Sequence, residues 1–311
     1  VNMSQIYVVG HKNPDNDSIM AAYTWANLKN MMDPDNEYIP VRLGPLPAEA
    51  EMIFAEYGIE DAPALIDHVE EGDKVYLVDH NELGQAVDGI EKAEVVGVVD
   101  HHRIADLQTA GPIEFLNMPV GSTTSVITML YGICGIDIQD DIAACLLSAL
   151  LTDTVIMKSP TCTFVDEERI DMLSKQLGVD ATEFGMKIFK SRGGDDDVTV
   201  EEICSRDSKE FNFAGRKVWV AQYETVDLEG MRKRIPEISA QVAKIQEEGG
   251  YDAALMLLTD IIVEGSEFIA AGDVSFIEGG FSISFADGSV WMPGVLSRKK
   301  QVAAVLADYA G

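Results

Sequence analysis

The first half of the chain alternates short apolar runs with segments of helical periodicity. The apolar runs predict strands at 5–9, 38–43, 74–78, 95–99 and 114–119. The helical periodicity predicts helices at 18–31, 48–57, 83–90, 123–131 and 140–151. Short runs of Val, Ile and Leu that alternate with helices are typical of a parallel sheet covered on both faces. The pattern therefore predicts an α/β fold, with a doubly wound, mostly parallel sheet in the N-terminal half.

The pattern changes near residue 191, where a glycine pair and three acids fall within 191–197. This composition suits an exposed linker, which we interpret as a hinge at Gly193-Gly194. Beyond it, strands are expected at 217–223, 253–258, 267–271 and 281–285, and helices at 231–248 and after Ser297. The sequence thus predicts two domains, residues 1–190 and 198–311, the second being a smaller α/β domain with a mixed sheet.

The strongly acidic composition limits which kinds of molecule the protein can bind. The 311 residues include 53 acidic and 23 basic side chains, for a formal net charge of −30. Such a surface repels the phosphates of nucleic acids, so we expect no nucleic-acid partner and assign most of these carboxylates to solubility. No apolar run approaches the roughly 18 residues that a membrane span needs, and no secretory signal is visible. Four cysteines without regular spacing indicate a reduced, cytoplasmic protein.

Four clusters of polar residues follow predicted elements of the first domain: 11–18, 79–81, 100–102 and 152–154. The first three come directly after strands. Because ligands of open parallel sheets bind outside the carboxyl ends of the strands, we expect these clusters to meet at one site. Four of the five histidines belong to them, namely His11, His80, His101 and His102.

Imidazole nitrogens mixed with several carboxylates suit a divalent ion such as Mn²⁺ or Co²⁺. Converging carboxylates repel one another unless a cation is present, so metal is the natural counter-charge. Two neighbouring ions need a bridging carboxylate, for which Asp79 on a middle strand is the first choice. Such a pair can hold a deprotonated water and present it in line to phosphorus.

Each cluster also has a simpler interpretation. Asp79-His80 alone is more often a loop or capping pair, Asp17-Ser18 could N-cap the first helix, and Asp153 could be a buried structural acid. Together, however, a pattern of HxxxDxD, DH, DHH and D on successive elements is hard to produce by chance.

A basic cluster lies far away in sequence, at residues 297–301. Arg298, Lys299 and Lys300 open the predicted last helix, where positive charge opposes the helix dipole unless an anion is bound. A phosphate at this helix N-terminus removes the objection, although a solvated basic patch is the plainer alternative. Lys209, taken alone, gives little indication of a binding site.

These motifs resemble the DHH phosphoesterase superfamily and, within it, the family II (manganese-dependent) inorganic pyrophosphatases. The matching stretches are HKNPDNDS at 11–18, DHNE at 79–82, DHHR at 100–103, TDT at 152–154, KSPTCT at 158–163, SKEF at 208–211 and SRKKQ at 297–301. They run in the expected order across nearly the whole chain. The departures are TDT in place of the commoner SDT, and Ala303-Ala304 where relatives often carry prolines. Neither removes a ligand.

The resemblance implies a DHH metal-binding catalytic domain followed by a DHHA2-like substrate-binding domain that closes over the site. It implies one metal held by His11, Asp15 and Asp79, and a second held by Asp17, Asp79, His101 and Asp153. It assigns the pyrophosphate to His102, Lys209, Arg298 and Lys299, with Asn81 nearby. It further implies two Mn²⁺ (or Co²⁺) ions per subunit, Mg²⁺ entering with the substrate, and a homodimer.

The sequence thus predicts hydrolysis of pyrophosphate to two orthophosphates by a hydroxide that bridges the two metals, without a covalent intermediate. Asp15 or Asp17 could relay its proton. A short-chain polyphosphatase would use the same metals and a similar basic helix, so it remains the alternative. A DHH-type nuclease or phosphodiesterase is disfavoured because no histidine follows His102. A third alternative is a metal-binding regulatory protein that catalyses no reaction. It is disfavoured because such a protein would not need every metal ligand and the SRKKQ stretch as well.

Overall fold

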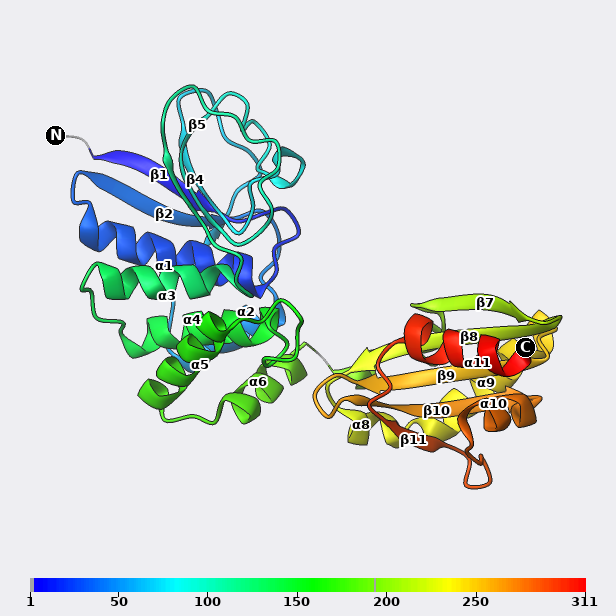
Figure 1. The fold of residues 1–311 in the computed structure, drawn as a ribbon. Helices are drawn as coiled ribbons and strands as arrows, with labels where there is room; N and C mark the ends of the chain where they lie inside the picture. Colours follow the sequence, from blue (N-terminus) through cyan, green and yellow to red (C-terminus); the bar gives the residue numbers. More distant parts are fainter. Residues whose placement is uncertain (1–2, 193) are drawn as a thin grey trace. The chain divides into compact units, whose positions relative to one another are not determined.

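Two β-sheets, one in each half of the chain, organise the fold (Figure 1). The computed structural model describes residues 3–192 and 194–311. The chain divides into two compact units, 1–192 and 193–311, which we call the N-terminal and C-terminal units. The division falls inside the segment 191–197, although Gly193 of the predicted hinge pair lies outside the described residues. The role of this segment as a hinge stays a prediction.

The N-terminal sheet has six strands in the order β3-β2-β1-β4-β5-β6, and all its pairings are parallel. Its strands are β1 (Ser4–Val9), β2 (Asn36–Arg42), β3 (Ala64–Leu65), β4 (Lys74–Val78), β5 (Glu94–Asp100) and β6 (Glu114–Asn117). The predicted parallel sheet is confirmed. Strand order reverses between β1 and β4, and a ligand site is expected at the carboxyl ends of these two strands.

Helices lie on one side of this sheet (Figure 1). They are α1 (Asn16–Met32), α2 (Ala48–Glu56), α3 (Thr123–Ile133), α4 (Asp140–Asp153), α5 (Phe164–Leu177) and α6 (Ala181–Lys190). Of these, α1 and α3 are the ones that pack against its strands. Helix α4 is buried on all sides from Ile142 to Thr152, because it lies in a second layer between α1 and the outer helices. An apolar run without a polar face is what such a position requires.

Loops cover the opposite face of the sheet, where Val9, Val75 and Val98 pack against residues of the β4–β5 and β5–β6 connections. The helix predicted at 83–90 is therefore wrong. Only a 3₁₀ turn, Leu83–Gln85, forms there. Val87 is buried against the sheet from an irregular segment, so its apolar character reflects burial and not helical periodicity.

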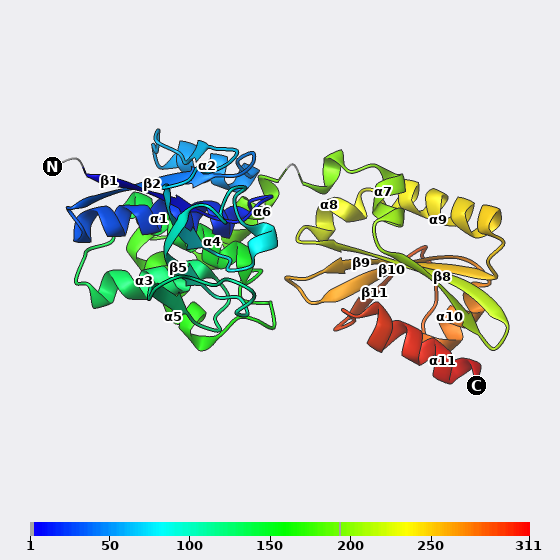
Figure 2. The ribbon, with the colours of Figure 1, turned by 90° about the horizontal axis from the view of Figure 1, so that it is seen from above.

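The C-terminal sheet has five strands in the order β11-β10-β9-β8-β7. They are β7 (Ser208–Phe213), β8 (Arg216–Thr225), β9 (Ala253–Asp260), β10 (Gly265–Gly272) and β11 (Val290–Pro293). Only β8 and β9 are parallel, so the predicted mixed sheet is confirmed. Figure 2 shows α7 (Val200–Ser205), α8 (Leu228–Arg232) and α9 (Ile235–Gly249) on one face of it, and α10 (Val274–Phe281) and α11 (Ala304–Ala310) on the other. Strand β9 is buried on both faces.

Three predictions for this unit need correction. The single helix expected at 231–248 is two helices, because Pro236 lacks an N–H and stands in the first turn of α9. The strand expected at 281–285 is absent from the described residues, since α10 ends at Phe281 and Ser282 has a left-handed φ of 55°. The last helix opens as a π-helical segment, Arg298–Ala303, before α11. Among the described residues, no helix is long and apolar enough to cross a membrane.

Candidate metal centre

Carboxylates and imidazoles from four elements meet at the carboxyl ends of β1, β4 and β5. His11 follows β1, Asp79 follows β4, His101 follows β5, and Asp153 is the last residue of α4. Within the described residues, three groups have ligand atoms that lie within 4.8 Å of one another. These groups are His11, Asp15 and Asp79; Asp17, Asp79, His101 and Asp153; and Asp79, His101 and His102.

The first group is organised around the His11 ring. Its Nε2 atom lies 3.3 Å from Asp79 Oδ2 and 3.5 Å from Asp15 Oδ2. Its Nδ1 atom lies 2.7 Å from the Lys12 carbonyl oxygen, which can only accept, so Nδ1 carries the proton. The Nε2 atom therefore faces the carboxylates, the orientation that a metal-ligating histidine takes.

The second group repeats this design around His101. Its Nδ1–H donates to the Val120 carbonyl oxygen at 2.7 Å, and its Nε2 lies 3.3 Å from Asp79 Oδ1 and 3.5 Å from Asp153 Oδ2. This Nε2 atom is buried and finds no hydrogen-bond partner among the described residues. A buried ring nitrogen that faces carboxylates and has no hydrogen-bond partner is available to a cation, so the donor set fits a divalent metal.

Asp79 belongs to both groups and turns one oxygen toward each. Oδ2 faces His11 and Oδ1 faces His101. The backbone of Asp79 is left-handed, with a φ of 62°, and its N–H donates to the carbonyl oxygen of Val99 on β5. A non-glycine residue in this region costs about 1–3 kcal/mol, and such strain clusters at functional sites. The geometry suits a carboxylate that bridges two ions.

The turn after Asp153 is also strained. Val155, Ile156 and Met157 all have positive φ, at 49°, 50° and 63°. The turn is closed by Thr154, whose Oγ1 donates to the Leu150 carbonyl and accepts from the Met157 N–H. Strained backbone of this kind persists only where surrounding contacts hold it, and the Thr154 bonds are such contacts directly beside Asp153.

The carboxylates and histidines of a metal-free centre share protons. Burial opposes the charged form of His11, yet hydrogen bonds to Asp15 and Asp79 raise its pKa to about 11. Burial acts likewise on His101, but Asp79 and Asp17 raise its pKa to about 10. For Asp17, burial and then the charge of Asp79 raise the pKa to about 8. Burial and the charge of Asp17 raise the pKa of Asp153 well above its usual range. Bound protons thus supply positive charge that a metal cation would replace.

Asp100, the first residue of the DHH motif, organises its neighbours. It is fully buried, and its Oδ1 accepts from the backbone N–H groups of His101 and His102 and lies 2.8 Å from His102 Nδ1. These contacts hold the pKa of Asp100 below its usual range against the effect of burial. The His102 side chain is half exposed and lines a cavity of about 300 Å³ together with Asn81 and Arg103.

Asn81, predicted to lie near the substrate, is buried, and its side-chain amide is hydrogen-bonded within the protein. Its Nδ2 donates to Asp100 Oδ2 and the Arg103 carbonyl, and its Oδ1 accepts from the Ala105 N–H. His80 is also buried, with Nδ1 bonded to the Val78 carbonyl. It belongs to none of the three groups, and burial lowers its pKa.

Two local details correct or extend the sequence interpretation. The N-cap of α1 is Asp15, whose Oδ1 accepts from the Ser18 N–H, so the proposed cap at Asp17-Ser18 is wrong. Sequence reasoning also missed Ser122 and Thr123 at the start of α3, which contact Asp17 and Asp79. Their only local signal is the N-cap character of Ser122.

The basic cluster lies in the C-terminal unit and has few fixed contacts. Arg298 donates to the carbonyl oxygen of Asp207 and forms an ion pair of 2.8 Å with its carboxylate, which places it beside the start of β7. Lys209 follows two residues later on β7 and is exposed, with Nζ 5.8 Å from the ring centroid of Phe211. Lys299 is exposed. Within this unit, Arg298 and Lys209 therefore both lie near the start of β7.

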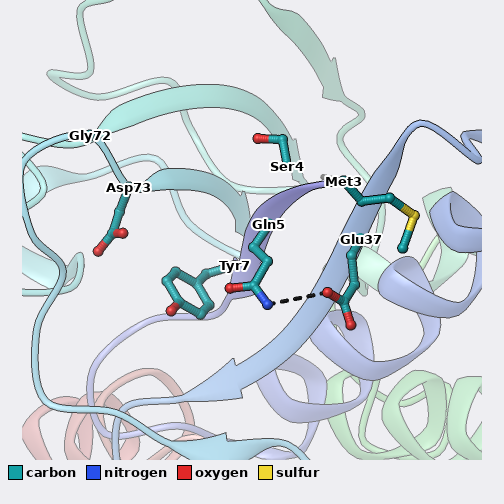
Figure 3. A pocket seen from close by; sticks show the side chains of 7 residues that line it. All are labelled: Met3, Ser4, Gln5, Tyr7, Glu37, Gly72 and Asp73. Atoms are coloured by element: carbon teal, nitrogen blue, oxygen red, sulfur yellow. Dashed lines mark hydrogen bonds between the residues drawn. The ribbon is translucent and has the colours of Figure 1, made fainter. Parts of the chain in front are cut away.

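The opposite end of the N-terminal sheet offers a contrast. Figure 3 shows an open pocket beside the start of β1, lined by Gln5, Tyr7, Glu37 and Asp73 among others. Its drawn hydrogen bond joins Gln5 Nε2 to Glu37 Oε2 at 3.2 Å. No histidine lines it, whereas the three ligand groups found among the described residues lie at the other end of the sheet.

Two family models match successive parts of the chain. Residues 5–150 match the DHH family, N-terminal domain, and residues 186–309 match the DHHA2 domain. The fold and site therefore define a protein of the DHH/DHHA2 class.

Full-length relatives narrow the class. An Archaeoglobus fulgidus protein assigned to the manganese-dependent inorganic pyrophosphatases is 44% identical, covering 96% of this chain and 95% of its own length. The manganese-dependent inorganic pyrophosphatase of Bacillus subtilis is 38% identical, covering 98% of this chain and 99% of its own. A Methanococcus jannaschii crystal structure assigned to the family II inorganic pyrophosphatases superposes with a TM-score of 0.59 at 36% identity, over 98% and 99% of the two chains. The chain belongs to the family of manganese-dependent, family II inorganic pyrophosphatases.

Proposed function

We propose that this chain hydrolyses inorganic pyrophosphate to two orthophosphates at a centre of two Mn²⁺ or Co²⁺ ions. The observation that carries the proposal is the position of Asp79, which presents one oxygen to each of two ligand groups. Membership of the pyrophosphatase family supplies the substrate.

The residues that would hold the metals follow from the two groups. His11, Asp15 and Asp79 would bind one ion, and Asp17, Asp79, His101 and Asp153 the other. When bound, such ions act as Lewis acids and lower the pKa of water. We expect Mg²⁺ to enter with the pyrophosphate, because the substrate carries several negative charges.

Positive side chains would bind and orient the substrate. We assign the phosphate oxygens to His102, Lys209, Arg298 and Lys299. His102 is half exposed beside the metal ligands, and Asp100 fixes its ring through Nδ1. Asn81 would act indirectly, because its amide holds Asp100 and the loop at 103–105. Charge developing on the equatorial oxygens is stabilised by such fixed donors.

Asp15 is better placed than Asp17 to accept a proton. The Asp15 side chain is 54% exposed, whereas Asp17 is fully buried and receives hydrogen bonds from Ser122 and Thr123. A proton delivered to Asp15 can leave to solvent. We therefore propose Asp15 for the relay and a purely ligating role for Asp17.

The experiment is phosphate release by purified, chelator-stripped protein in Mg²⁺ with and without added Mn²⁺. The proposal expects rapid hydrolysis of pyrophosphate that depends on Mn²⁺. Cleavage of polyphosphate in preference to pyrophosphate would show that the substrate is wrong while the centre stands. The homodimer stays a prediction, which sedimentation of the same protein tests.

A further inference from the structure

A short segment that leads into α3 and includes its first residue contacts three of the predicted metal ligands. We call residues 120–123 the orienting segment. Its Val120 carbonyl accepts from His101 Nδ1 at 2.7 Å, and Thr123 Oγ1 donates to Asp79 Oδ1 at 2.9 Å. Asp17 receives two bonds, from Ser122 Oγ at 2.7 Å and from the Thr123 N–H at 2.9 Å. The segment therefore contacts ligands from three different elements, because Asp17 lies in the first turn of α1, Asp79 follows β4 and His101 follows β5.

The orienting segment is itself held by Asp166 of α5. This carboxylate is fully buried. Its Oδ2 accepts from the Gly121 N–H at 2.8 Å, and its Oδ1 accepts from Ser125 Oγ. Oδ2 also accepts from the N–H and hydroxyl of Thr163, the N-cap of α5, at 2.7 and 2.9 Å. One carboxylate thus fixes both the start of α5 and the segment that aims the metal ligands.

Packing around Gly121 makes this connection rigid. A Cβ atom on Gly121 would lie 2.7 Å from Thr154 Cγ2 and 3.0 Å from Asp166 Oδ2. Thr154 follows the ligand Asp153 directly. Gly121 is therefore closely packed between Asp166 and Thr154 at the end of α4, and a side chain at this position would displace one of them.

We propose that Asp166 and Thr123 are positioning residues of the metal centre, acting through the orienting segment on Asp17, Asp79 and His101. The inference rests on the proposed metal centre but not on its substrate. Outer partners of metal ligands set ligand orientation, and their loss typically weakens metal binding by about ten- to hundredfold.

The first test replaces Asp166 by Asn and measures the Mn²⁺ dissociation constant and the Mn²⁺ dependence of turnover. One amide oxygen cannot serve four donors, so Asp166→Asn should weaken Mn²⁺ binding about ten- to hundredfold. Turnover at saturating Mn²⁺ should fall much less. The matched control is Glu202→Gln, because Glu202 caps α7 by the same bonds to Thr199 and contacts no metal ligand. It should bind Mn²⁺ as the parent does.

A second test uses Thr123, so that the inference can still be refuted if Asp166→Asn does not fold. Thr123→Val removes the hydroxyl that bonds Asp79 but keeps the shape, and Thr123→Ser keeps the hydroxyl. We expect weaker Mn²⁺ binding for valine and near-parental binding for serine. Parental Mn²⁺ affinity in folded Asp166→Asn or in Thr123→Val would overturn the inference. Parental protein that binds Mn²⁺ without cleaving pyrophosphate would refute the proposed function alone.

Discussion

The metal centre and the basic cluster differ in how firmly their charged side chains are held. The centre gathers negative charge on buried, hydrogen-bonded side chains, whereas the cluster carries positive charge on mostly exposed ones. In the centre, His11 and His101 are fixed through Nδ1, and the buried carboxylate of Asp17 is held by a hydroxyl and an N–H. In the basic cluster, Lys209 and Lys299 are exposed, and Arg298 has one acidic partner on the surface. Converging carboxylates must be held in place before a cation arrives, because they repel one another. Long basic side chains can be ordered by the substrate, at a cost of up to about 2 kcal/mol each.

This difference predicts that substitutions in the centre abolish turnover, whereas those in the basic cluster weaken substrate binding. The largest effect is expected for Asp79→Ala, which removes the residue common to both ligand groups. Loss of several kcal/mol of charge stabilisation should lower kcat by about a thousandfold or more. Steady-state assays at saturating Mn²⁺ measure it. Asp73→Ala, a carboxylate just before the same strand, is the control and should leave kcat unchanged.

In the basic cluster, Lys209→Ala and Arg298→Ala should each lower kcat/KM by about ten- to hundredfold. A hydrogen bond to a charged group contributes about 1.5–3 kcal/mol. Mn²⁺ affinity should not change, since neither residue lies among the ligand groups. Lys300→Ala tests whether position or net charge matters, because Lys300 is an exposed neighbour with no assigned role. An equal loss in Lys300→Ala would contradict a specific site.

Metal binding should weaken as the pH falls. The metal-free pKa values of His11 and His101 are raised to about 11 and 10, so both rings are protonated near neutral pH. Mn²⁺ competes for the same Nε2 atoms, and each proton displaced makes affinity fall about tenfold per unit decrease in pH. Titration of Mn²⁺ into weakly buffered protein at pH 7 should acidify the solution. Absence of proton release would show that the rings are neutral before metal binds.

The smallest effect is expected for Asp207→Asn. It removes the surface carboxylate that pairs with Arg298 but keeps the carbonyl contact. Exposed ion pairs contribute about 0–1 kcal/mol, so kcat/KM should change by less than about fivefold. A larger change, measured alongside Arg298→Ala, would mean that this pair prepares the arginine for the substrate and that the cluster is less adaptable than its exposure suggests.

Most residues of the candidate metal centre could be found from sequence because they follow strands whose limits are marked locally. The run at 74–78 is apolar between Asp73 and Asp79, and β4 has those bounds. Segments whose apolar residues are buried without regular structure were misread. Phe281, Ile283 and Phe285 alternate as in a strand, yet they pack on the sheet from the end of α10 and the loop after it.

The residues that orient the ligands could not be predicted, because their partners are far away in sequence. Asp166 and Gly121 are 45 residues apart, and Thr123 and Asp79 are 44 apart. Locally, Thr163 and Asp166 form only a capping box, a motif that also occurs at Thr199 and Glu202 without any metal ligand nearby. Tertiary structure distinguishes the two.

The most direct test of the account is to count bound Mn²⁺ per chain while pyrophosphate turnover is measured on the same stripped and reloaded protein. The account predicts that activity rises with occupancy until two Mn²⁺ ions are bound per chain, and that Asp79→Ala reaches neither full occupancy nor activity. Full turnover with one ion or none would contradict a centre built on a shared Asp79.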